Sequence, residues 1–416
     1  MAKLTLTPQQ QAVVENRGGR LLVSAAAGSG KTKVLVERLF RYMEEEHCNV
    51  DDFLIITYTK AAAAELRSKI ASELSKKVAE QPKNKHLKRQ MMRVYRADIK
   101  TVDAFCTALL RENTHLLPQK DSKYALTPDF RVLDDNDATL IRQRVLDRTL
   151  ERFYSDFDAG KELLADTLGA GRDDRALSAL VLELYNKLQS HAYPEKWTEE
   201  SRKVWKDCEL EFDQTPYANE LMLFIRRKAA HWAALLQQGV DRAAEDPALS
   251  SGYGEKFLVA MSGFLELSAA SGWDSAGKIA ERIEFPRLST PKGRKDDPDV
   301  AALKQIWESS KEGYKKLEQL LAVSSDEAVE DLAAVAPAML ALLDLTEAFS
   351  EAYRTEKLRM NAADFSDQEH LALQLLVRAD GTATELGEQI AARYTEVLVD
   401  EYQDTNEVQN AIFRAV

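Results

Sequence analysis

The sequence is poor in cysteine and has no apolar run long enough to cross a membrane. Its three cysteines, Cys48, Cys106 and Cys208, are far apart and form no C-x-x-C pair, which excludes a disulfide framework and a zinc ribbon. The longest uncharged apolar run, Leu332–Leu343, contains Pro337 and is shorter than the roughly 20 residues of a membrane span. The first ten residues lack the apolar stretch and cleavage site of a secretory signal. We therefore expect a soluble cytoplasmic protein without a membrane partner.

Acidic residues outnumber basic ones over the whole chain, but one segment has an excess of basic residues. The 416 residues include 56 lysines and arginines against 68 aspartates and glutamates, a net charge of −12. This balance excludes a protein that coats nucleic acid along its whole surface. Between Lys60 and Lys100, however, twelve residues are basic and four are acidic. This basic stripe predicts a local DNA contact, with an ordinary solvated helical surface as the alternative, and it includes Lys76, Lys77, Lys83, Lys85, Lys88, Arg89, Arg93 and Arg96.

Short apolar runs near both ends of the chain predict a parallel sheet. The runs are Leu21–Ser24, Phe53–Tyr58, a weaker Ile99–Val102 and, far along the chain, Glu396–Asp400. Helical patterns with apolar residues three and four positions apart separate them. Nearly continuous apolar strands alternating with helices are typical of a parallel sheet covered on both faces. The ends of the chain are therefore predicted to be α/β.

The middle of the chain, from about residue 135 to residue 360, is predicted to be helical. Asn136 or Asp137 can cap a first helix, and residues 285–298 are predicted to form an exposed basic loop, rich in proline. We predict one α/β domain built from residues 1–120 and 362–416, with an all-helical domain inserted at residues 121–361. The first helix is expected to bury one face, made of Ile141, Val145, Leu146, Leu150 and Phe153. Five tryptophans are expected to pack in the helical core: Trp197, Trp205, Trp232, Trp273 and Trp307.

The run that follows Leu21–Ser24 has the composition of a phosphate-binding loop. Small residues let the backbone wrap a phosphate with its N–H groups pointing inward, and the following helix N-terminus favours negative charge. Lys31 would contact the β- and γ-phosphates, and Thr32 would bind Mg²⁺. Ala25 stands where the general pattern has glycine, and the alternative is a small-residue turn with a surface lysine. The predicted nucleotide-binding residues are Ser24, Ala25, Ala26, Ala27, Gly28, Ser29, Gly30, Lys31 and Thr32.

Two carboxylates follow the last apolar run, Val397–Val399. At the end of a buried strand, Asp400 could hold Mg²⁺ through water, and Glu401 could polarise the water that attacks a γ-phosphate. A strand that ends in solvated acids is the alternative. Together with the phosphate-binding loop, this pair predicts an ATP- and Mg²⁺-dependent site.

The stretch Asp400–Thr405 resembles motif II of superfamily 1 DNA helicases of the UvrD, RecB and AddA type. Leu6–Gln10 resembles the Q motif of this family, which implies that Gln10, with Gln9 as a near alternative, reads the adenine of ATP. The loop Ala25–Thr32 resembles motif I, in which alanine often replaces the first glycine. The resemblance implies a RecA-like P-loop fold and catalytic roles for Lys31, Glu401 and Gln403, and it assigns Gln403 and Asp404 to coupling between nucleotide and DNA.

Two further segments resemble the DNA-contacting motifs of the family. Thr57–Leu66 is similar to motif Ia, although Lys60 replaces an asparagine, and Tyr58 offers a ring on which a base can stack. Thr101–Cys106 is similar to motif Ib, although Asp103 and Ala104 replace the usual histidine and serine. The resemblance implies DNA binding by Thr57, Tyr58, Thr59, Lys60, Thr101 and Phe105.

The long stretch between motifs Ib and II distinguishes this chain from the compact UvrD-like helicases. Within it, Gln189–Trp197 and Asp364–His370 resemble segments of AddA. The resemblance implies the AddA-type component of a helicase–nuclease that unwinds and resects double-strand DNA breaks for recombinational repair, with AddB as its partner. His191, Asp364 and Asp367 are interpreted as structural, the two aspartates as a solvated helix cap.

The sequence stops shortly after motif II. We therefore expect an N-terminal fragment without the second motor domain and the nuclease domain, which binds nucleotide weakly and hydrolyses little of it. Two other interpretations stay open. One is a UvrD- or RecB-like helicase without its own nuclease, and the other is a non-motor P-loop scaffold that binds a partner protein.

Overall fold

The computed structural model describes residues 6–26, 28–117, 124–156, 158–168, 175–206 and 211–416. The chain divides into two compact units. The first unit comprises residues 1–157, 172–197 and 344–416, and the second comprises residues 158–171 and 198–343. Both ends of the chain therefore fold into one unit. The functional domain limits proposed from the sequence stay a prediction.

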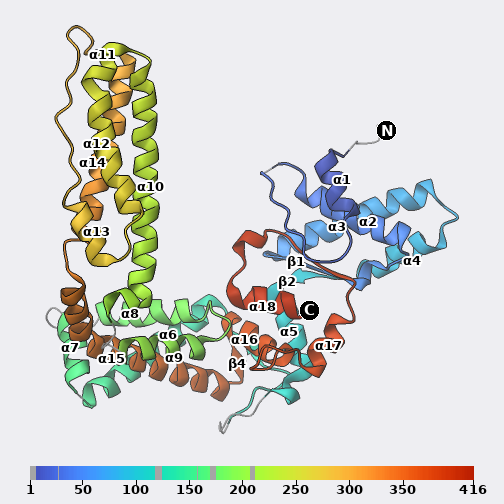
Figure 1. The fold of residues 1–416 in the computed structure, drawn as a ribbon. Helices are drawn as coiled ribbons and strands as arrows, with labels where there is room; N and C mark the ends of the chain where they lie inside the picture. Colours follow the sequence, from blue (N-terminus) through green and yellow to red (C-terminus); the bar gives the residue numbers. More distant parts are fainter. Residues whose placement is uncertain (1–5, 27, 118–123, 157, 169–174, 207–210) are drawn as a thin grey trace. The chain divides into compact units, whose positions relative to one another are not determined.

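A three-stranded parallel sheet lies in the first unit (Figure 1). Its strands are β1 (Phe53–Thr57), β2 (Asp98–Thr101) and β5 (Glu396–Val399), in the order β2-β1-β5. Leu54 of β1 pairs with Asp98 of β2, and Ile56 of β1 pairs with Val399 of β5. Three of the four predicted strands are thus confirmed, and the third of them joins a neighbour more than three hundred residues away in sequence.

The predicted strand at Leu21–Ser24 is wrong. These residues have no regular secondary structure, and Leu21, Leu22 and Val23 are 45%, 76% and 40% exposed. An apolar run becomes a strand only where a neighbouring strand offers unpaired N–H and C=O groups. The outer strands β2 and β5 each keep one edge that pairs with no described strand, but residues 21–24 do not join either of them. Hydrophobicity alone therefore misled the prediction.

Helices cover both faces of the sheet because the β1 side chains alternate between them. Phe53 and Ile55 pack with α2 (Lys31–Glu45), α3 (Lys60–Glu80) and α4 (Lys85–Arg93). Leu54 and Ile56 pack with α5 (Val102–Asn113), α16 (Phe365–Leu376) and α18 (Glu407–Ala415). The sheet is therefore the middle layer of an α/β core, as the strand pattern predicts. The remaining elements near it are α1 (Pro8–Glu15), α17 (Glu385–Ala391) and a parallel pair of short strands, β3 (Arg131–Val132) and β4 (Ala362–Ala363).

The rest of the first unit is helical. Helix α6 (Asp135–Ser155) buries the predicted face of Ile141, Val145, Leu146, Leu150 and Phe153. Its N-cap is Asp134, whose side chain accepts from the Asp137 N–H at 2.8 Å, so the caps predicted at Asn136 or Asp137 are wrong by two or three residues. Helices α8 (Arg175–Leu188), α9 (Pro194–Lys206) and α15 (Ser325–Arg359) complete the set, and the last two supply residues to both units.

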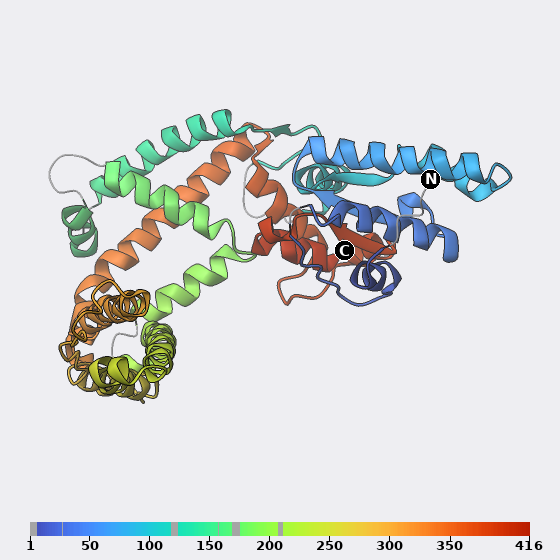
Figure 2. The same cartoon turned by 90° about the horizontal axis from the view of Figure 1, so that it is seen from above.

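The second unit is a bundle of long helices. These are α10 (Pro216–Ala244), α12 (Glu255–Ser268), α13 (Trp273–Ala280) and α14 (Pro298–Leu320), with α7 (Ala159–Leu168) and the short α11 (Pro247–Leu249). Figure 2 views the bundle along its helix axes. Trp273 and Trp307 lie in its core and Trp232 packs against that core, as predicted. The residues between α13 and α14 form the predicted irregular segment.

Helix α15 is long and apolar enough, by length and composition, to cross a membrane. Its most apolar window is 44% buried in the structure. A core helix of a water-soluble protein meets the same two criteria, so this feature is a weak indication of a membrane span.

Candidate functional site

Gln10 joins helix α1 to the predicted phosphate-binding loop. Thr7 caps α1: its hydroxyl accepts from the Gln10 N–H at 3.2 Å, and the Gln10 Oε1 atom accepts from the Thr7 N–H at 3.0 Å. This capping box orients the Gln10 amide so that its Nε2 atom donates to the Ser29 carbonyl oxygen at 3.1 Å. Gln9 is exposed. Of the two glutamines, Gln10 is the one whose side chain contacts this loop.

The loop itself is a tight turn that ends in an uncapped helix. Gly28 and Gly30 have φ angles of +77° and +86°, a left-handed conformation that favours glycine. Gly30 is the N-cap of α2 and provides no side-chain hydrogen bond, which leaves the first N–H groups of the helix for a ligand. The Lys31 amine donates to the Ala25 carbonyl oxygen at 3.3 Å, and Thr32 is half-buried at the second helical position. This arrangement fits an anion such as a phosphate; Ala27 lies outside the described residues.

A buried ion pair fastens the helix after the loop to the last strand. Arg38 of α2 is only 3% exposed, and its Nε atom donates to the Glu396 carboxylate of β5 at 2.9 Å and 3.2 Å. The same guanidinium donates to the Asn16 carbonyl oxygen at 2.7 Å, at the end of α1. Burial lowers the pKa of Arg38, but the Glu396 carboxylate more than reverses this effect, so the net shift of the pKa is upward. The sequence analysis missed this pair, although a lone arginine on the apolar face of α2 was a visible signal.

The acidic end of β5 has an unusual backbone. The Asp400 N–H donates to the Ile56 carbonyl oxygen at 3.0 Å, which extends the β1–β5 ladder by one residue. Glu401 then takes a left-handed conformation with φ of +56°, rare for a residue with a side chain and typical of functional sites. Gln403 donates to the Glu401 carboxylate at 2.6 Å, and the Glu401 N–H donates to Asp400 at 3.1 Å. The three predicted residues Asp400, Glu401 and Gln403 thus form one hydrogen-bonded group.

The predicted DNA-binding residues lie at the same edge of the sheet as Asp400. Thr57 pairs with Thr101, so the carboxyl ends of β1 and β2 are aligned, and β5 ends beside them. Thr57, Thr101 and Phe105 are buried, and Thr101 caps α5 by accepting from the Ala104 N–H at 3.2 Å. The contacts of these three side chains are structural, and contact with DNA stays a prediction for them.

Tyr58, Thr59 and Lys60 are more accessible. Thr59 and Lys60 are exposed, and Thr59 caps α3 through the Ala62 N–H at 3.0 Å. Tyr58 is half-buried, and its hydroxyl lies 2.5 Å from the Thr405 hydroxyl. Tyr58 therefore joins the end of β1 to the segment that follows the acidic group of β5.

The comparison with known families agrees with this geometry. The sequence profile of the UvrD/REP helicase N-terminal domain matches residues 6–416. The chain belongs to this family.

Several longer proteins are similar to the chain over its whole length, and all three named here are A subunits of an ATP-dependent helicase/nuclease. The protein of Lachnoclostridium phytofermentans is 32% identical over 441 residues, which cover 100% of this chain and 31% of that protein. The protein of Desulfitobacterium hafniense is 36% identical over 440 residues, which cover 99% of this chain and 30% of that protein. The protein of Clostridium beijerinckii is 31% identical over 428 residues, which cover 100% of this chain and 34% of that protein. The chain thus spans about a third of the length of the relatives it matches, and the resemblance inferred from its motifs is confirmed.

The basic stripe of this UvrD/REP family member lies on α3 and α4 and on the residues next to them, Lys83 and Arg96 (Figure 1). Three of its members are paired with carboxylates: Lys76 with Glu73, Lys77 with Glu44, and Arg93 with Asp51. Ion pairs of this kind at the surface contribute little stability and leave the cations accessible. DNA contact by the stripe stays a prediction, and its exposed side chains are those of Lys76, Lys83, Lys85, Lys88, Arg89 and Arg96.

Three residues interpreted as structural behave as such, with one correction. His191 lies 2.9 Å from the Glu407 carboxylate and stacks on Trp197, which is 37% exposed rather than in a helical core as predicted. Asp364 caps α16 as expected, but the prediction that this cap is solvated is wrong. The Lys357 amine, itself buried, donates to Asp364 at 2.9 Å and lies 2.6 Å from Asp367.

Proposed function

We propose that this chain is the N-terminal part of an ATP-dependent DNA helicase–nuclease of the AddA type. The observation that carries the proposal is the pair of contacts made by the phosphate-loop region. Gln10 reaches the loop at Ser29, and Arg38 of the following helix reaches β5 at Glu396. The segments that carry Gln10, the loop and the start of β5 are therefore linked to one another, which supports a nucleotide site built from both ends of the chain. The names of the relatives, which describe an ATP-dependent helicase/nuclease, support this proposal.

In this proposal, the backbone from Ser24 to Thr32 holds the phosphates of ATP, and Gln10 reads its adenine. The Lys31 amine leaves the Ala25 carbonyl for the β- and γ-phosphates. Thr32 and Asp400 would hold Mg²⁺, which would supply positive charge to the oxygens of the transferred phosphate. Glu401, held by Gln403, orients the attacking water. The left-handed backbone at Glu401 sets the direction of this carboxylate.

Single-stranded DNA would pass the carboxyl edge of the sheet, where Tyr58, Thr59 and Lys60 are accessible. Residues 1–120 and 362–416 would act as the first motor domain, with 121–361 as its helical insertion. The resemblance places the transition-state arginines and the nuclease domain in parts of the relatives that these 416 residues do not match. An arginine of that kind raises the rate of ATP hydrolysis by a factor of about 10³–10⁵. The chain alone should therefore bind ATP but hydrolyse little of it. A partner protein of the AddB type and a cytoplasmic location complete the proposal.

Nucleotide binding tests the proposal directly. A fluorescent ATP analogue should bind the 416-residue chain in the presence of Mg²⁺. Lys31→Ala should weaken this binding about tenfold or more, because a charged hydrogen bond to phosphate is lost. Lys33→Ala, which removes an exposed lysine two residues later, serves as the control. Equal losses in both variants, or none in either, would contradict the assignment, as would hydrolysis at the rate of a complete motor.

A further inference from the structure

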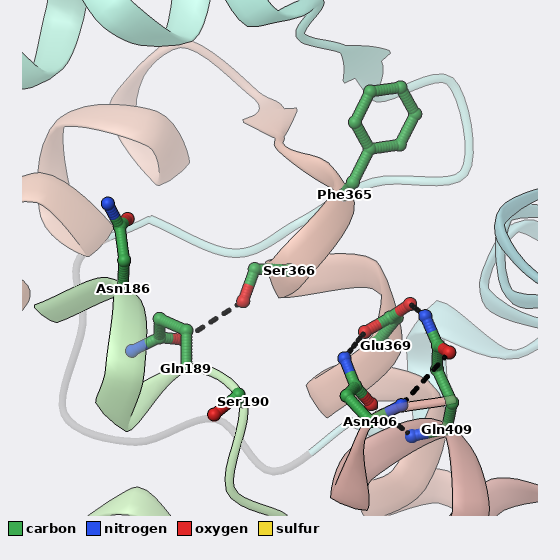
Figure 3. A pocket seen from close by; sticks show the side chains of 8 residues that line it. All are labelled: Asn186, Gln189, Ser190, Phe365, Ser366, Glu369, Asn406 and Gln409. Atoms are coloured by element: carbon green, nitrogen blue, oxygen red, sulfur yellow. Dashed lines mark hydrogen bonds between the residues drawn. The ribbon is translucent and has the colours of Figure 1, made fainter. Parts of the chain in front are cut away.

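A polar pocket of about 260 Å³ lies in the first unit, beside the predicted DNA-binding edge (Figure 3). Three segments form it: the end of α8 with the residues after it, the start of α16 and the start of α18. A volume below the roughly 300–1,000 Å³ typical of drug-sized ligands suits part of a ligand rather than a whole nucleotide. The lining residues are Asn186, Gln189, Ser190, Phe365, Ser366, Glu369, Asn406 and Gln409.

The lining has the chemistry of a nucleobase site rather than of a phosphate site. It offers four side-chain amides, two hydroxyls and the Phe365 ring, which is 40% exposed, but no lysine or arginine. Side-chain amides pair with the hydrogen-bonding edges of bases, and exposed aromatic rings stack on their faces. Phosphate groups, in contrast, are bound mainly by cations and free N–H groups.

One wall of the pocket is held rigid by a buried carboxylate. Glu369 is buried and accepts from the Gln409 amide at 2.7 Å and from the Asn406 amide at 3.3 Å. The carbonyl oxygen of the Gln409 side chain in turn accepts from the Tyr58 hydroxyl at 3.3 Å. The pocket wall and the residue predicted to stack a base are therefore directly connected.

The opposite wall leaves hydrogen-bonding groups free. The Ser366 hydroxyl donates to the Gln189 Oε1 atom at 3.1 Å, which fixes that amide and leaves its NH₂ group turned away from Ser366 (Figure 3). Within the described parts of the chain, neither this NH₂ group nor the Asn186 side chain makes a hydrogen bond. These are groups that a ligand can satisfy.

We propose that this pocket holds one unstacked base of single-stranded DNA, with the amides of Gln189 and Asn186 at its edge. The inference rests on the proposed function, because the strand must already pass Tyr58. The sugar and phosphate of the same nucleotide stay outside the pocket, where no cation is needed from its lining. The pocket thus adds a base contact that is made through α8 and α16 rather than through the sheet edge.

The test measures binding of fluorescent oligothymidylate to the 416-residue chain by anisotropy at low salt. Gln189→Ala and Asn186→Ala should each weaken binding about five- to tenfold, as expected for the loss of one base contact. Both variants should bind a wholly abasic oligonucleotide of the same length as well as the parent does. Gln238→Ala, which removes an exposed amide in the second unit, should change neither affinity.

The possible outcomes separate the pocket from the proposed function. If Tyr58→Ala weakens binding but the pocket variants do not, the pocket proposal fails and the proposed function stands. If the parent binds no single-stranded DNA, both fail. If the pocket variants instead weaken binding of the fluorescent ATP analogue and leave DNA binding unchanged, the base that occupies the pocket belongs to free nucleotide and the DNA proposal is overturned. Unchanged melting temperatures would show that the variants are folded.

Discussion

The two units of this chain use different interactions in their interiors. Every buried charged side chain among the described residues lies in the first unit: Arg38, Asp98, Glu356, Lys357, Asp364 and Glu369. The core of the second unit is built from apolar and aromatic side chains, such as Phe257, Phe264 and Trp307. Burying a charge is costly unless it is paired. Two of the ion pairs join segments that are remote in sequence, Arg38 with Glu396 and Asp98 with Arg393, whereas Lys357 and Glu356 pair with residues nearby in the chain.

The largest effect is expected in the second unit. Trp307 is buried and packs on Phe257 and Phe285, with ring centroids 5.0 Å away in both cases. Trp307→Ala should lower the free energy of unfolding by about 3–5 kcal/mol, because the lost contacts leave a cavity. Urea unfolding followed by circular dichroism would measure it. Trp197→Ala, at an exposed position, is the control, and equal effects of the two changes would refute the packing argument.

A similar loss is expected from one charge in the first unit. Lys357 is almost fully buried and pairs with both Asp364 and Asp367. Lys357→Met keeps the apolar stem but leaves two carboxylates without their cation, which should cost about 3 kcal/mol or more. The exposed Lys83→Met is the control in the same urea measurement. A neutral result for Lys357→Met would mean that the buried charges of the first unit do not hold it together.

Substitution of Arg38 is expected to have a smaller effect on the free energy of unfolding, and also to weaken nucleotide binding. Arg38→Met should cost about 2 kcal/mol, since Glu396 is partly accessible to water and can be solvated when its partner is lost. It should also weaken binding of the ATP analogue severalfold, because α2 carries the phosphate-binding loop. Arg41→Met, on the same helix with an exposed partner, should do neither. Stability lost without any change in nucleotide affinity would separate the ion pair from the site.

The smallest expected effect is a dependence of the stability on pH, caused by Asp367, which pairs with Lys357. Burial raises the pKa of Asp367 to about 6, and the nearby Asp364 carboxylate adds to this, while Lys357 acts against it. Because the folded state then holds its proton more tightly than the unfolded state, stability should rise as the pH falls from 7 to 5. The gain should be about 1 kcal/mol relative to Asp367→Asn, which cannot titrate. Parallel pH curves for the two proteins in urea unfolding would contradict this.

The sequence predicted features that depend on local pattern. The strands at Phe53–Thr57 and Glu396–Val399 follow from short, nearly continuous apolar runs, and the buried face of α6 follows from a period-3.6 pattern in its own residues. Features that depend on a distant partner were missed or misjudged. The run Leu21–Ser24 has strand composition but pairs with no strand, and Asp364 looked like a solvated cap because nothing nearby showed that Lys357 would be buried against it.

The residues of the candidate site also fall into those that a local pattern predicts and those that depend on a distant partner. The motif residues Gln10, Lys31 and Asp400 could be named because each motif is contiguous. The ion pair of Arg38 with Glu396 and the pocket around Glu369 bring together residues hundreds of positions apart, or from three separate helices. No local spacing could reveal them.

The central claim is that the two ends of this chain form one nucleotide site. A crystal structure of the chain with Mg²⁺ and a non-hydrolysable ATP analogue tests it most directly. We expect the Lys31 amine on the terminal phosphates, with Thr32 and Asp400 around a single metal ion, the latter through water. A triphosphate bound away from Lys31, or a metal ion that Asp400 does not approach, would contradict it.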